Sequence, residues 1–249
     1  MSFLGPVGPL LENGVRAWRW SEVACFAAAV TLGMEALAVL LPTVFTTREQ
    51  MPTNKAKHLE RFEARDWTYV YINKVLTVVF VYHFCRLIWL HPGVEWSLDR
   101  LTLLNSAGSL VAFYCVYDLP YTVFHRMLHH RSIYRYIHKH HHRQIVPTRG
   151  NYDAINVHPF EFVVGEYMHL LAIYIVPCHV ITVLVFLVLS GVLASLNHTR
   201  FLIQIPFLYD TKNHDVHHQL FDYNFGQYSM LYDKAFGWFR AYEESSKRS

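Results

Sequence analysis

Four stretches of the 249-residue chain are long and apolar enough to predict helices that lie in a membrane. A membrane-spanning helix needs about 20 mostly apolar residues. Glu35 interrupts the first stretch, and Pro177 lies near the middle of the fourth. Because proline removes a backbone donor and tends to break a helix, we expect the fourth stretch to be a hairpin of two helices. The four stretches cover residues 23–45, 67–90, 101–124 and 160–196.

This pattern predicts an all-α integral membrane protein with a polar helical cap. We expect residues 1–124 to hold an N-terminal segment and the first three transmembrane helices. Residues 125–249 should form the cap, which includes the membrane hairpin 160–196. No internal repeat or linker divides the chain further.

The distribution of basic residues predicts how the chain is oriented in the membrane. Lys and Arg collect on the cytoplasmic side of membrane proteins. The loop between the second and third stretches has only Arg100, against Glu95 and Asp99. We therefore expect the polar middle and the tail in the cytosol and the N-terminus across the membrane. The basic residues after the third stretch are Arg126, Arg131, Arg135, Lys139, Arg143 and Arg149.

Composition excludes several other classes of protein. Charged residues make up 16% of the chain and hydrophobic residues 53%, which is too few charges to cover a soluble domain of this length. The net charge of +3, without a basic stripe, gives no reason to expect a nucleic-acid partner. The four cysteines lie inside apolar stretches and form no C-x-x-C motif, so a disulfide framework and a thiolate zinc site are not expected. We expect no haem or nucleotide site either.

Seventeen histidines are many for this length, and their spacing is typical of metal ligands. Side chains four apart on a helix lie on one face, so an H-x-x-x-H pair can point both rings at one ion. The chain has one such pair, then two H-x-x-H-H clusters whose members we expect to share a face, and one further histidine after the hairpin. These nine are His125, His129, His138, His141, His142, His198, His214, His217 and His218.

Nine imidazoles are too many for one ion and enough for two. Imidazole suits iron, zinc and copper, whereas calcium and magnesium prefer oxygen ligands. We therefore expect a two-metal site in the cap, close to the cytosolic membrane surface. His130 and His140 neighbour these ligands on the wrong helical face and are expected to have solvated or packing roles.

The chain resembles the fatty acid hydroxylase superfamily, the sterol desaturase-like membrane di-iron enzymes, over about residues 110–240. Asp118 precedes the first histidine pair, Pro147 follows the second cluster, and His158-Pro-x-Glu161 follows in turn. The ending Asn224-Phe-Gly and Tyr232-Asp-Lys-Ala-Phe-Gly is similar to the closing pattern of the family. The segments 141–147 and 214–220 look like those of sphingoid-base hydroxylases.

The chain also departs from the family pattern at two places. Thr199-Arg200 stands where the family often has Ser-Gly or Cys-Gly. Fatty acid 2-hydroxylases carry a further ligand histidine at the position of Ala194, which leaves one coordination position unassigned. His158 or a water could fill it.

The resemblance implies an oxygen-dependent oxidoreductase of the endoplasmic reticulum. Two iron ions, which zinc can replace, would support hydroxylation or desaturation of a sterol intermediate, a sphingoid base or a fatty acyl chain. Electrons would come from a separate cytochrome b5 or a similar donor. Asp118, two turns before His125, and Asp215, inside the last cluster, are candidates to orient the ligand rings by hydrogen bonds.

Two alternatives from other classes stay open. The first is an inactive relative that acts as a scaffold, which the departures at Ala194 and Thr199-Arg200 would fit. The second is a histidine-rich metal-binding or transport protein. Transporters place their ligands near the middle of the bilayer, whereas these clusters lie at helix ends and in basic segments.

Overall fold

The computed structural model describes residues 19–44, 50–51, 61–206 and 208–243. Five long helices make up most of the fold, which confirms the all-α class. They are α2 (Trp20–Val44), α3 (Ala64–Leu90), α4 (Leu103–Leu128), α7 (Pro159–Ile175) and α8 (Val180–Asn197). The expected N-terminal segment before residue 19 and most of the basic loop before the second stretch lie outside the described residues.

Short elements connect and cap the long helices. The helical ones are η4 (Leu98–Arg100), α5 (Arg131–Tyr134), η5 (His138–Arg143), α6 (Asn151–Ala154), α9 (Thr211–Leu220) and α10 (Leu231–Phe236). Strand β1 (Val94–Glu95) pairs in parallel with β2 (Cys178–His179). Strand β3 (Gln204–Ile205) pairs antiparallel with β4 (Tyr209–Asp210).

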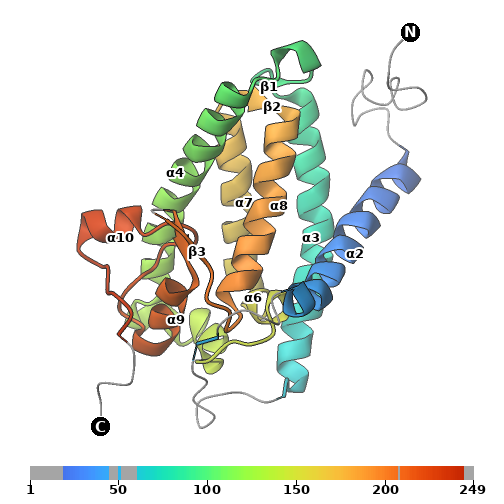
Figure 1. The fold of residues 1–249 in the computed structure, drawn as a ribbon. Coiled ribbons are helices and arrows are strands. Elements are labelled where there is room, and N and C mark those ends of the chain that lie inside the picture. The colour runs from blue at the N-terminus through green and yellow to red at the C-terminus, as the bar shows by residue number, and fades with distance from the viewer. Residues whose placement is uncertain (1–18, 45–49, 52–60, 207, 244–249) are drawn as a thin grey trace, which may run out of the picture.

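Helices α3, α4, α7 and α8 run roughly along one direction, with short elements at both ends and with α10 and β3 beside the middle (Figure 1). Helices α3, α4, α7 and α8 form the bundle, and α2 leans across the side of α3 and α8. Strands β1 and β2 close one end, and α6 and α9 lie at the other. The expected hairpin is confirmed, because α7 ends at Ile175 and α8 begins at Val180, with Pro177 between them.

Two helices of the described chain, α3 and α8, are long and apolar enough to cross a membrane. Only 33% and 44% of the residues in their most apolar windows are buried inside the protein, so much of their apolar surface faces outward. Apolar side chains that face outward in this way are suited to contact with lipid. The fold is therefore consistent with an all-α membrane protein.

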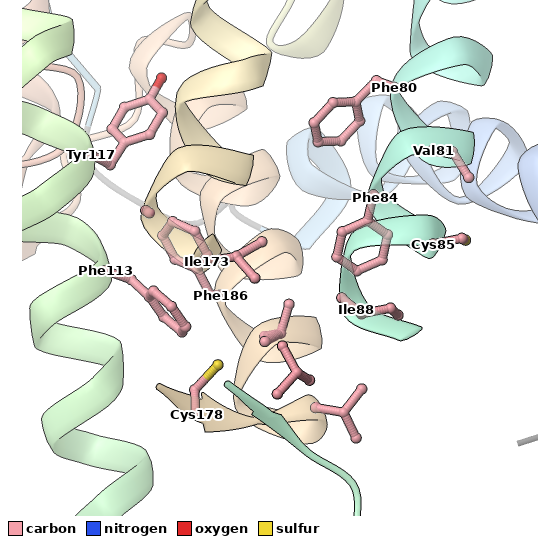
Figure 2. Close-up of a cluster of buried hydrophobic side chains, with 14 of the residues drawn as sticks. Phe80, Val81, Phe84, Cys85, Ile88, Phe113, Tyr117, Ile173, Cys178 and Phe186 are labelled. Atoms are coloured by element: carbon pink, nitrogen blue, oxygen red, sulfur yellow. The ribbon is translucent and has the colours of Figure 1, made fainter. Parts of the chain in front are cut away.

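The inside of the bundle is an apolar core to which all five long helices contribute (Figure 2). Phe80 and Phe84 come from α3, Phe113 from α4 and Phe186 from α8. The rings of Phe113 and Phe186 stack with centroids 4.7 Å apart. This core fixes the spacing of the helices and hence of the polar ends that they carry.

Polar contacts at the start of α3 attach the cap to the bundle. Asp66 is fully buried and accepts hydrogen bonds from the Glu63 backbone, 2.8 Å away, and from Asn156 Nδ2, 3.0 Å away. Its Oδ1 also lies 3.0 Å from His140 Nε2, which belongs to η5. Farther along α3, the Asn73 amide donates to the carbonyls of Ile155 and Val157. These bonds hold η5 and the segment before α7 against α3.

Candidate metal centre

All nine histidines with ligand spacing converge at the cap end of the bundle, in two separate groups. Within each group the ligand nitrogen atoms lie within 4.8 Å of one another. We name them the five-histidine group and the four-histidine group. The first consists of His125, His129, His138, His142 and His217, and the second of His141, His198, His214 and His218.

The structure corrects the expectation that each H-x-x-H-H cluster shares one face. In α9, His214 and His218 enter the four-histidine group, while His217 between them enters the other. In α9, 3.6 residues per turn nearly align positions i and i+4, whereas adjacent positions differ by about 100°. In η5, His138 and His142 stay together and His141 joins the second group, although this segment is a 3-10 helix in which positions i and i+3 align. Helical spacing therefore explains the division in α9 but not the division in η5.

The ring orientations are set by hydrogen bonds from Nδ1 to backbone carbonyls. His125 Nδ1 lies 2.8 Å from Phe225 O, and His217 Nδ1 lies 2.8 Å from Tyr223 O. His198 Nδ1 reaches Ala194 O at 2.8 Å, and His218 Nδ1 reaches Gln144 O at 2.9 Å. A carbonyl oxygen can only accept, so each of these Nδ1 atoms carries the hydrogen. In a neutral imidazole, Nε2 then presents a bare lone pair.

Within each group the Nε2 lone pairs face one another, as they would around a bound cation. His125 and His217 both present an unprotonated Nε2 within the five-histidine group, and His198 and His218 do so in the other. His129 Nε2 is buried and has no hydrogen-bond partner among the described residues. Facing lone pairs repel unless a shared positive charge separates them. The nitrogen-only donor set suits a transition metal such as iron or zinc.

Burial keeps these histidines in the form that binds metal. Desolvation lowers the pKa of His138, His142 and His217 well below its usual value, and the neighbouring rings lower it further. The same cause acts on His141, His214 and His218. Metal ligation needs the neutral imidazole, so these residues are ready to bind metal at neutral pH.

The two aspartates that the sequence singles out do not touch the ligand rings. Asp118 accepts from the backbone N–H groups of Tyr228 and Ser229 and from the Ser229 hydroxyl. It therefore fixes the segment after Phe225 to α4. Asp215 forms a buried ion pair with Arg200 and accepts from Gln219 Nε2 at 2.7 Å. Neither aspartate is within hydrogen-bond distance of a ligand ring. Their hydrogen bonds and ion pair instead hold segments of the cap together.

The carboxylate that does contact a ligand ring is Glu161, in the first turn of α7. Its Oε1 lies 2.8 Å from His138 Nδ1, and both side chains are buried. The motif His158-Pro-x-Glu161 includes this residue, but the sequence did not indicate its role. Its place three residues after His158 in an apolar helix was the available signal, because a buried carboxylate needs a partner.

The remaining histidines of the cap lie outside both groups. His158 caps α7, where its Nδ1 accepts from the Phe160 backbone at 3.2 Å, and it belongs to neither group. His130 is exposed and caps α5 in the same manner. His140 is buried and bonds to Asn156 and Asp66, which fits the packing role expected for it.

An apolar cavity of about 530 Å³ leads from the histidines into the bundle. His141, His198 and His214 of the four-histidine group line it, and His125 is the member of the five-histidine group that does. Its apolar walls come from residues on α2, α3, α4, α7 and α8, among them Phe26, Phe80, Phe84, Tyr121, Leu184 and Leu187. Ala194 also lines it, one turn before His198. A cavity of this size is in the range of sites for small molecules.

Known proteins are similar to this chain in sequence over somewhat more than half of its length. The lathosterol oxidase of Rattus norvegicus is 35% identical over 136 residues, which cover 53% of this chain and 45% of that protein. The lathosterol oxidase of Homo sapiens is 32% identical over 142 residues, or 55% and 47% of the two chains. The Delta(7)-sterol 5(6)-desaturase ERG3B of Gibberella zeae is 31% identical over 155 residues, or 61% and 47%.

The chain spans a little less than half the length of these relatives. No solved structure matches it. A family model described as fatty acid hydroxylase matches residues 110–238, just over half of the chain. This range holds all nine histidines of the two groups together with Glu161. The chain belongs to the fatty acid hydroxylase family.

Proposed function

We propose that this protein is a membrane-bound di-iron oxygenase that hydroxylates or desaturates a lipid. The observation that carries the proposal is the pair of histidine groups beside an apolar cavity. Two separate sets of unprotonated nitrogen ligands support two ions, and the cavity supports a substrate with a large apolar surface. The family membership and the sterol-modifying relatives agree with an oxidoreductase that acts on lipids.

The residues of the chain hold, orient and isolate the reacting groups. The nine histidines would hold two irons, which when bound supply the activation of oxygen that an unreactive C–H bond requires. The carbonyls of Phe225, Tyr223, Ala194 and Gln144 fix the ring planes, and Glu161 fixes His138. The apolar cavity walls keep bulk water away from the reacting carbon.

The four-histidine group is the side on which we expect the substrate to react. Three of its members line the cavity, compared with one member of the other group. Ala194 lies on the cavity side where an additional ligand would stand, and its methyl group leaves that position open. An open coordination position next to an apolar cavity is what a catalytic metal needs, in contrast to a closed structural site.

Among the three lipid classes that the sequence leaves open, we favour a sterol. The relatives are described as lathosterol oxidases and a Delta(7)-sterol 5(6)-desaturase. Hydroxylation or desaturation with one O2 consumes two electrons and two protons that do not come from the substrate. We propose a cytochrome b5 or a similar protein as their source, and an endoplasmic reticulum membrane with the histidines on the cytosolic side.

Lipid analysis of cells tests this function. The chain is expressed in a host that lacks sterol desaturation, with His217→Ala as the matched inactive variant, and the sterols are analysed by mass spectrometry under oxygen. We expect a sterol that loses two hydrogens or gains one oxygen only with the intact chain. If fully metal-loaded protein changes no sterol, sphingoid base or acyl chain in any host, the enzyme function is wrong and the scaffold alternative replaces it.

A further inference from the structure

The wall of the apolar cavity contains an ion pair, formed by two residues of the long helices α2 and α3. Glu35 of α2 and Lys74 of α3 both line the cavity, and Lys74 Nζ is in direct contact with Glu35 Oε1. Tyr152 of α6 donates its hydroxyl hydrogen to Glu35 Oε2 at 2.6 Å. Lys74 Nζ also lies 4.9 Å from the centre of the Tyr152 ring. Three separate elements therefore meet at this pair.

Stability alone gives little reason for such a pair. Removing two charges from water costs about as much as their attraction returns, so apolar side chains at both positions would stabilise the helices as well or better. Ionisable residues within membrane helices are costly, and they commonly serve a ligand or a pathway. The side chains of Lys74 and Glu35 keep 22% and 30% of their surface exposed. Space therefore remains for another molecule to reach them.

The ion pair lies at the same end of the bundle as the histidines. Tyr152 belongs to the short helix α6, which begins after Gly150, and the Gly150 N–H donates to the carbonyl of His198 at 2.9 Å. Asn73, the neighbour of Lys74, is bonded to the carbonyls of Ile155 and Val157 in the segment that follows α6. A molecule held at Lys74 and Glu35 would thus occupy the cavity beside the four-histidine group.

The hydrogen-bonding capacity of the pair defines which chemical group it can take. The Lys74 ammonium has three N–H donors, and Glu35 is its one hydrogen-bond acceptor among the described residues. Each Glu35 oxygen has two lone pairs and accepts one hydrogen bond from the described residues, Oε1 from Lys74 and Oε2 from Tyr152. A hydroxyl group can accept from Lys74 and donate to Glu35 at the same time. The two charges cancel, so neither an anionic nor a cationic headgroup is favoured.

We propose that Glu35 and Lys74 form a subsite that binds the hydroxyl group of a neutral lipid, such as the hydroxyl of a sterol. The apolar body of the lipid then lies along Phe80, Phe84, Leu184 and Leu187, which line the same cavity. The proposal rests on the proposed function for the identity of the lipid, but the binding of the hydroxyl group does not depend on turnover.

A binding experiment without turnover tests the subsite. The full chain, loaded with zinc, is placed in lipid nanodiscs and titrated with radiolabelled cholesterol, its 3-methyl ether and its 3-sulfate. The ether keeps the shape but removes the donor, and the sulfate removes the donor and adds a negative charge that the neutral pair does not compensate. For the unchanged protein we expect cholesterol to bind about tenfold more tightly than the ether, as is typical of a hydrogen bond to a charged group. The sulfate should bind more weakly than cholesterol.

The ratio of the affinities for cholesterol and for the ether distinguishes recognition of the hydroxyl group from a structural role of the ion pair. In Glu35→Gln we expect the tenfold preference to fall to about twofold or less, with the ether bound as before. In Lys74→Met we expect cholesterol and the ether to weaken together, because the oxygen of either ligand can accept from Lys74. A purely structural role of Glu35 would weaken both ligands equally in Glu35→Gln and keep the ratio. Thr77→Val is the matched control, since Thr77 lines the same cavity on α3 but donates to the Asn73 carbonyl at 3.0 Å. It should keep the tenfold preference.

The outcomes distinguish this subsite from the proposed function. The subsite is refuted if the unchanged protein binds cholesterol and the ether equally, if it binds neither, or if the preference survives in Glu35→Gln. If the binding experiment refutes the subsite but cells that express the chain contain oxidised sterols, the proposed function stands. The expected ratios without any oxidised lipid support the subsite and refute the oxygenase. Retained zinc content in each variant shows that the protein is folded.

Discussion

Glu161 Oε1 lies 2.8 Å from Nδ1 of His138, a member of the five-histidine group, and both side chains are buried. When Nε2 of His138 binds a metal, Nδ1 keeps its hydrogen and donates it to this carboxylate. Partners of this kind fix the ring and increase its basicity, and their loss commonly costs about 10- to 100-fold in metal affinity or activity.

We therefore expect Glu161→Gln to release metal from the five-histidine group about 10- to 100-fold more readily than the unchanged protein. Competition with a fluorescent chelator, followed by metal analysis, measures the affinity. Glu63→Gln is the control, because Glu63 is exposed and lies at the start of α3. Equal affinities in Glu161→Gln and the unchanged protein would contradict the role of this carboxylate.

Metal content tests the two-group arrangement directly. Purified protein should contain about two metal ions per chain, because two separate sets of ligands are present. We expect His138→Ala to lose at least one ion and all turnover. In the control His130→Ala the content should stay at two, since His130 is exposed and only caps α5. A single ion in the unchanged protein after reconstitution with excess ferrous iron would show that the groups share one site.

Ala194 offers a gain-of-ligand test. A histidine at this position lies one turn before His198 on the cavity side of α8, where it can join the four-histidine group. In Ala194→His we expect slower release of metal to a chelator together with reduced turnover, because the open position is then filled. Ala194→Leu adds similar bulk without a ligand atom, so it should reduce turnover without slowing metal release. If both variants release metal at the same rate, Ala194 does not mark the open position.

The buried histidines predict how the stability of the metal-free protein depends on pH. Burial lowers the pKa of His141, His142, His214 and His218 below its usual value near 6.5, so the unfolded chain binds protons that the folded chain does not. The folded state is then fully stable above about pH 6.5 and loses stability as the pH falls below it. Thermal unfolding of chelator-treated protein should show a lower midpoint at pH 5.5 than at pH 8.

Bound metal should raise the midpoint at pH 8, since a ligand that binds only the folded state stabilises it by about 2.7 kcal/mol at 100 times its dissociation constant. A midpoint of the metal-free protein that does not change between pH 8 and pH 5.5 would show that these rings are not buried in solution.

The orientation in the membrane is tested by labelling introduced cysteines. Asp99 and Lys139 are both exposed and lie at opposite ends of the bundle, next to β1 and in η5 respectively. In sealed microsomes we expect an impermeant maleimide to label Lys139→Cys at once and Asp99→Cys only after permeabilisation. Exposed Cys25 is replaced by Ser in both variants. The reverse order of labelling would place the histidines in the lumen.

Asn197-His198-Thr199 has the pattern of an N-glycosylation sequence, but it cannot serve as such a test. Asn197 is buried, and its amide donates to the Gln227 carbonyl at 2.8 Å. We expect no glycan there on either side of the membrane.

The sequence by itself determined the local features of this protein. Long apolar runs are helical because a backbone away from water must satisfy its own hydrogen bonds, and Pro177 separates α7 from α8 because it lacks an N–H. The spacing of the histidines identified the nine side chains that converge at the cap. These conclusions depend on neighbours along the chain, where 3.6 residues per turn relates one position to the next.

Only the tertiary structure decided how the nine histidines are divided between the two groups and which residues surround them. Whether His141 belongs with His138 or with His198 depends on where α8 and α9 pack, which no local spacing contains. The same holds for Glu161 against His138, for Asp118 against Ser229, and for Glu35 against Lys74, which are 23, 111 and 39 positions apart. Such contacts follow from the packing of whole helices around the apolar core, because burial of that core fixes which faces meet.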